Sequence, residues 1–136
     1  MKRRHITLAA FALLAGFGAA LAEPAKSEYP DYDDDLMKDL DRTIKYFEPD
    51  ISGGNDAGVA DDLAVLRQGF NYTEKYFAKR GKPDAVKISQ DGLKALDAVS
   101  QALAAKAVED AAAKAREATD ACRACHDVYK PKQARG

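Results

Sequence analysis

The sequence has few side chains that bind metals or form disulfides, and this scarcity excludes several kinds of site. Tryptophan is absent, and cysteine, methionine and histidine each occur only twice among the 136 residues. Both cysteines belong to one short motif, so none is left for a structural disulfide between distant segments. Beyond that motif, too few cysteines and histidines remain for a zinc site. No basic run with interleaved aromatic residues predicts binding to nucleic acid.

Residues 1–22 have the pattern of a secretory signal peptide. A basic start is followed by an apolar run at residues 6–18 and by an Ala-Leu-Ala cleavage pattern that ends at Ala22. We therefore expect export to the periplasm and a single mature domain at residues 23–136. A transmembrane anchor is the alternative, but the apolar run is shorter than the roughly 20 residues that a spanning helix needs. The mature protein is expected to have no membrane segment.

A Cys-x-x-Cys-His motif at residues 122–126 is the most specific feature of the chain. This pattern is typical of the covalent attachment of one haem c, with thioether bonds from both cysteines and the histidine as iron ligand. Positions three apart share a helix face, so Cys122 and Cys125 can reach one edge of the macrocycle while His126 faces the iron. A redox dithiol or a disulfide between these cysteines is the alternative. Such dithiols follow a strand at a helix N-terminus, whereas this motif ends an alanine-rich helical pattern.

The choice of the second axial ligand is limited, because few side chains of this chain can bind the iron. Signal cleavage removes Met1 and His5, which leaves His126 as the one histidine and Met37 as the one methionine of the mature chain. Ligation by two histidines of the same chain is thereby excluded. The remaining choices are Met37 opposite His126, or an open sixth position with Met37 as a core side chain.

Helical periodicity runs through the mature chain, and no strand-like alternation competes with it. Apolar residues recur at helical spacing in four segments: residues 31–48, 56–79, 84–106 and 108–130. Pro49 is expected to end the first segment, and neither Gly nor Pro marks the junction of the last two. Gly69 is interpreted as a tolerated glycine, with a close approach of a neighbouring helix or the haem as the alternative. Four such segments with short loops predict an all-α, antiparallel up-down-up-down four-helix bundle with covalently bound haem.

This architecture predicts that Met37 and His126 lie at the same end of the bundle. In an up-down-up-down arrangement the first and last helices are antiparallel neighbours. Met37 lies near the start of the first segment and His126 near the end of the last. At the helical rise per residue they are about 9 Å and 6 Å from the same end. We therefore expect one haem to fit between the two side chains.

Three stretches of the chain match a known family pattern. Residues 122–130 read Cys-Arg-Ala-Cys-His-Asp-Val-Tyr-Lys, residues 32–40 place Met37 five positions after a tyrosine, and residues 103–118 are rich in alanine. With these features the chain resembles the cytochrome c′ family, most of all its low-spin, methionine-ligated branch. The resemblance implies a four-helix bundle with the haem near one end, His126 as the proximal ligand and frequent homodimers. Low-spin members carry electrons, whereas high-spin members bind nitric oxide or carbon monoxide at an open distal site.

The chain departs from that family pattern in two places. Asp33 and Asp34 stand where the low-spin pattern often has Arg-Gln, and Val108 stands where glycine is common between the last two helices. The resemblance adds that the basic residue at Lys130 lies close to His126, where its charge disfavours imidazolium. The sequence by itself predicts that Lys130 satisfies the last carbonyls of its helix.

The expected function is that of a periplasmic monohaem c-type cytochrome that transfers single electrons and is not an enzyme. No acid–base constellation accompanies the motif, so the haem iron does the chemistry. Acidic residues dominate residues 23–66 and basic residues dominate residues 67–136. Such a dipolar surface can orient a redox partner protein, and solvated helix faces are the simpler alternative. The functional alternative is a five-coordinate cytochrome c′ that binds nitric oxide or carbon monoxide.

Overall fold

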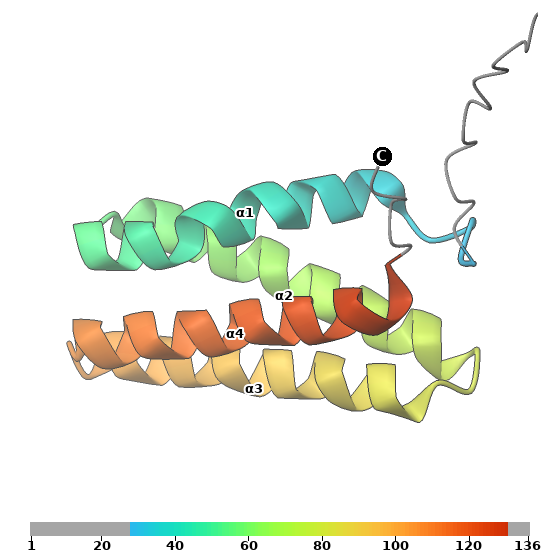
Figure 1. The fold of residues 1–136 in the computed structure, drawn as a ribbon. Helices are drawn as coiled ribbons and strands as arrows, with labels where there is room; N and C mark the ends of the chain where they lie inside the picture. Colours follow the sequence, from blue (N-terminus) through green and yellow to red (C-terminus); the bar gives the residue numbers. More distant parts are fainter. Residues whose placement is uncertain (1–27, 131–136) are drawn as a thin grey trace, which may run out of the picture.

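The computed structural model describes residues 28–130, most of which are helical (Figure 1). Four helices follow one another along the chain: α1 Asp34–Gly53, α2 Asp56–Ala78, α3 Pro83–Ala104 and α4 Val108–Tyr129. No strand occurs within the described residues, so the all-α prediction is confirmed. No helix among them combines the length and the apolar character needed to cross a membrane. The predicted signal peptide, residues 1–22, lies outside the described part of the chain.

Consecutive helices run antiparallel and form a closed ring of neighbours. α1 packs against α2 and α4, and α3 packs against the same two helices. Across the described residues, the diagonal pairs α1–α3 and α2–α4 make no close backbone contact. Figure 1 shows the blue start of α1 and the red end of α4 at the same end of the bundle. This is the predicted up-down-up-down arrangement, and it brings the first turns of α1 alongside the last turns of α4.

The core combines large side chains from the first three helices with small ones from α4. The fully buried large residues include one from each of α1, α2 and α3: Phe47, Leu66 and Leu96. α4 adds fully buried alanines to the same cluster: Ala111, Ala115 and Ala118. Alanine at these positions lets α4 approach its neighbours closely, as its repeat in the sequence predicts.

α1 is longer than the sequence predicts, because Pro49 does not end it. The helix continues to Gly53 and stops where Gly54 adopts a left-handed conformation with a φ of 73°. Proline removes one backbone hydrogen bond of the helix, at a cost of about 3 kcal/mol. The turn that follows carries Ile51, whose side chain is only 2% exposed. Burial of an isoleucine contributes about 1.5–3 kcal/mol, so tertiary packing offsets most of the local cost and the expected stop at Pro49 is wrong.

The break between α3 and α4 is made by Lys106. Its φ of 58° is left-handed, a conformation that residues with a Cβ rarely adopt. Backbone hydrogen bonds of 2.9 Å from Lys106 to Leu103 and from Ala107 to Ala102 close the turn. These bonds satisfy the last carbonyls of α3 in the way that a glycine terminator usually does. The two helices are therefore separate, and α4 begins at Val108 as predicted.

Candidate functional site

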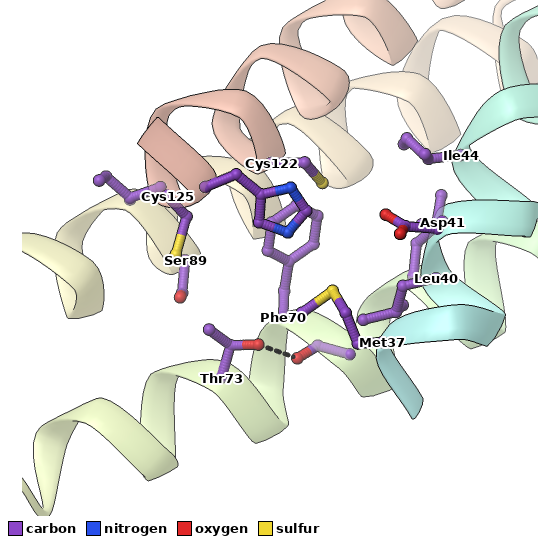
Figure 2. A pocket seen from close by; sticks show the side chains of 13 residues that line it. Met37, Leu40, Asp41, Ile44, Phe70, Thr73, Ser89, Cys122 and Cys125 are labelled. Atoms are coloured by element: carbon purple, nitrogen blue, oxygen red, sulfur yellow. Dashed lines mark hydrogen bonds between the residues drawn. The ribbon is translucent and has the colours of Figure 1, made fainter. Parts of the chain in front are cut away.

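One cavity collects all four residues that the sequence singles out as haem-binding. Met37 of α1 lines it together with Cys122, Cys125 and His126 of α4. The cavity, including its open mouth, has an empty volume of about 490 Å³, and its other walls are mostly apolar (Figure 2). The prediction that Met37 and His126 lie at the same end of the bundle is confirmed.

A second hollow adjoins this cavity toward the end of the bundle. It shares Met37, Cys125 and His126 with the first and has an open volume of about 690 Å³. Several of its other walls are aromatic: Tyr29, Tyr32, Phe77 and Tyr129. Together the two hollows surround the predicted ligands with mostly apolar and aromatic walls.

Cys122 and Cys125 lie one helical turn apart on the face of α4 that lines the cavity. Neither takes part in a disulfide. Burial, followed by the neighbouring Cys125, raises the pKa of the Cys122 thiol to about 12. Burial also raises the pKa of the Cys125 thiol to about 11. A redox dithiol needs a lowered thiol pKa to attack a disulfide, so this environment is unlike that of the dithiol alternative.

His126 is partly buried in the last turn of α4. Burial lowers its pKa below the ordinary value of 6.5, and the Lys130 ammonium acts in the same direction, while Asp41 and Asp127 oppose the shift. The net effect favours the neutral imidazole, which is the form that binds a metal. The backbone N–H of Lys130 donates to the His126 carbonyl at 3.0 Å. The main chain thus satisfies this carbonyl, and the charge of Lys130 acts on the imidazole.

Met37 lies at the end of the first turn of α1. Asp33 caps this helix, because its carboxylate accepts hydrogen bonds from the backbone N–H groups of Asp35 at 3.1 Å and Leu36 at 2.9 Å. The cap fixes where the helix begins and hence which side chains face α4. Figure 2 shows the Met37 sulfur directed from α1 into the cavity. The acidic residue at position 33, which departs from the family pattern, therefore has a structural role here.

Gly69 of α2 lies at the wall of the cavity where Leu40 of α1 packs onto it. A Cβ at position 69 would lie 2.2 Å from Cδ2 of Leu40, far inside van der Waals contact. The Gly69 carbonyl also accepts a 2.8 Å hydrogen bond from the Thr73 hydroxyl. The interpretation of Gly69 as a merely tolerated glycine is therefore wrong, because its missing side chain lets α1, and Met37 with it, approach α2.

Gly69→Ala is expected to destabilise the protein, although alanine is the better helix former. The gain in helix propensity is about 1 kcal/mol, whereas forcing a Cβ against the Leu40 side chain costs about 1–3 kcal/mol. We expect a net loss of about 1 kcal/mol in the free energy of unfolding, measured by chemical denaturation. Gly53→Ala is the matched control, because a Cβ there meets no atom within 4 Å. Equal stability of the two variants would contradict the role assigned to Gly69.

An aromatic cluster closes the end of the bundle beside the cavity. Six rings contact one another there: Tyr29, Tyr32, Tyr72, Tyr76, Phe77 and Tyr129. The hydroxyl of Tyr32 lies 2.6 Å from Oγ1 of Thr73, in a hydrogen bond that joins residues 41 positions apart. Burial raises the pKa of Tyr32 to about 12, so the phenol stays protonated. Four of the six rings also line the second hollow together with His126: Tyr29, Tyr32, Phe77 and Tyr129.

Asp31 ties the N-terminal arm to α2. The Tyr76 hydroxyl donates to Asp31 at 2.7 Å, and Arg80 forms an ion pair with the same carboxylate. The guanidinium of Arg80 also lies 3.6 Å from the centre of the Tyr76 ring. The Tyr76 hydrogen bond and then Arg80 lower the pKa of Asp31. Asp31 lies three residues before α1, so its contacts with Tyr76 and Arg80 help to hold the start of α1, and Met37 with it, against the cavity.

The donor set suits a haem iron better than a bare metal ion. Within residues 28–130, no group of three or more His, Cys, Asp and Glu side chains could hold a metal ion. What converges on the cavity is one imidazole, one thioether and two thiols on a single helix face, among apolar walls. Imidazole and thioether are axial donors to haem iron, and paired thiols are its covalent anchors. The residues therefore fit a haem c.

Searches with this chain returned no matching family model, no matching curated protein and no matching solved structure. Its function is accordingly inferred from its own residues and from the cavity that they line.

Proposed function

We propose that this protein is a monohaem c-type cytochrome that transfers single electrons. One haem c would be attached through Cys122 and Cys125, with His126 and Met37 as the axial ligands of its iron. The observation that supports this most is that these four side chains, from opposite ends of the mature chain, line one cavity. When bound, the haem supplies a one-electron iron couple.

The chain's own residues would set the conditions for electron transfer. Burial and Lys130 favour the neutral form of His126, so few protons have to leave before the imidazole binds a metal. The Met37 thioether raises the reduction potential relative to harder ligands. The cavity walls include the apolar side chains of Leu40 and Phe70, and an apolar surrounding of the iron would also affect its potential.

The proposal also includes a cellular location, redox partners and an oligomeric state. The signal-peptide pattern at residues 1–22 supports a periplasmic location. The resemblance to the low-spin branch of the cytochrome c′ family supports electron transfer to and from redox partner proteins, without an enzymatic activity of its own. The same resemblance is the basis for proposing a homodimer.

The second candidate is a five-coordinate cytochrome c′ that binds nitric oxide or carbon monoxide. The apolar wall beside Met37 favours it, because Leu40, Ile44 and Phe70 would surround a small neutral ligand there. The two functions differ in the role of one residue. Met37 is an iron ligand in the first and a packing side chain in the second.

The absorption spectrum of the purified protein, oxidised and reduced, with and without carbon monoxide, tests the proposal. Iron with both a histidine and a methionine ligand is low-spin and has no free position for the gas. We therefore expect a low-spin spectrum that carbon monoxide does not change. A high-spin spectrum that shifts with the gas would contradict the electron carrier and favour gas binding. A protein that carries no haem would contradict both candidates.

A further inference from the structure

Asp41 places a carboxylate on the wall of the proposed iron site. It lies one helical turn after Met37 on α1 and lines the same cavity as Cys122 and His126. Figure 2 shows its carboxylate directed into the cavity, on the side of α1 that also carries Met37 and Leu40. Among the described residues that line this cavity, Asp41 is the one acidic side chain.

None of the three cations on the nearby turns of α1 pairs with Asp41, and Lys45, one turn after it, lies over the Tyr46 ring. Lys38 pairs with Asp35 at 2.9 Å, and Arg42 pairs with Asp39. Within residues 28–130 the Asp41 side chain forms no hydrogen bond and no ion pair. No cation within the described residues therefore pairs directly with the Asp41 carboxylate.

The charge of Asp41 acts across the cavity on residues of α4. After burial and Cys125, Asp41 is the next cause that raises the pKa of the Cys122 thiol. It also opposes the fall in the pKa of His126 that burial and Lys130 cause. One carboxylate on α1 thus affects both a proposed haem anchor and the proposed proximal ligand.

We propose that Asp41 lowers the reduction potential of this cytochrome, because the negative charge of its unpaired carboxylate at the cavity wall favours the oxidised iron. The inference rests on the proposed function. One-electron reduction lowers the positive charge of the iron centre, so a fixed negative charge nearby stabilises the oxidised state more than the reduced state. Asp41 therefore acts against Met37, whose thioether favours the reduced state.

The expected size of the effect follows from the position of Asp41. The residue is exposed on its outer side, so water weakens its interaction with the site. We expect an effect of about fivefold on the ratio of oxidised to reduced protein, consistent with about 1 kcal/mol of charge–charge energy. For a one-electron couple this is about 40 mV.

The midpoint potential of the haem-loaded, full-length protein tests the inference. Asp41→Asn should raise the potential by about 40 mV. Asp41→Ala should give a similar rise, because both variants remove the negative charge. Asp41→Glu keeps the charge and should stay close to the wild type. Asp61→Asn is the matched control, because Asp61 is also exposed but lies in α2 and outside the cavity.

An absorption spectrum recorded before each potential measurement separates a failure of the proposed function from a failure of the role proposed for Asp41. A wild-type protein without haem, or without methionine ligation, contradicts the proposed function. A low-spin wild type in which Asp41→Asn shifts the potential no more than Asp61→Asn overturns the role of Asp41. A shift in Asp41→Ala but not in Asp41→Asn would also overturn it, because the cause would then be packing and not charge.

Discussion

Met37→Leu is expected to convert the haem iron from low-spin to high-spin and to open it to carbon monoxide. Leucine has nearly the volume of methionine, so the variant keeps the packing of α1 against the cavity. It lacks the thioether that would bind the iron. A titration with carbon monoxide, followed by absorption, should show no binding to the wild type and saturable binding to the variant. The reduction potential of the variant should also fall, because a methionine ligand raises it.

Leu36→Ala is the control for this prediction. Leu36 is the neighbour of Met37 on α1 and is likewise partly buried, but it does not line the cavity. Its truncation should lower the free energy of unfolding by about 2 kcal/mol or less, because the side chain is only partly buried, and leave the spectrum low-spin. If Met37→Leu stayed low-spin and insensitive to carbon monoxide, the sixth ligand would come from another group and the His126/Met37 assignment would be wrong.

Replacing both cysteines, Cys122→Ala together with Cys125→Ala, is expected to abolish covalent attachment of the haem. Axial bonds from His126 and Met37 to the iron would be lost when the chain unfolds, whereas thioether bonds would survive denaturation because they are covalent. The wild type should therefore keep its haem absorbance on a denaturing gel, and the double variant should lose all of it. Each single variant retains one thioether and should keep haem on the gel. Haem that stays on the denatured double variant would contradict the attachment site.

Much of the fold could be predicted because it depends on the period of apolar residues. α2 and α4 end within one residue of their predicted ends, since their apolar stripes continue to the last turn and turn residues follow. The end of α1 could not be predicted, because the burial of Ile51 overrides the local effect of Pro49. The left-handed turn at Lys106 could not be predicted either, since lysine gives no signal for that conformation.

The candidate site could be predicted where its residues are neighbours in the sequence or belong to residue types that occur rarely in this chain. Cys122, Cys125 and His126 form one motif, and the shortage of other donors makes Met37 the candidate for the opposite side of the cavity. The sequence offered a close approach at Gly69 only as an alternative. The packing of Leu40 onto Gly69 depends on how two helices meet side by side, and helical periodicity does not encode that. The links from Asp31 to Arg80 and from Tyr32 to Thr73 join residues 49 and 41 positions apart, a separation that no helical period encodes.

The mass of the purified and denatured protein tests the central claim most directly, namely that this chain carries one covalent haem c. The protein should be produced in a bacterial host that exports it and attaches haem c. The account predicts residues 23–136 plus the mass of one haem, and fragmentation should locate that added mass on the segment that contains Cys122 and Cys125. A mature chain whose mass includes no haem under these conditions would contradict the account.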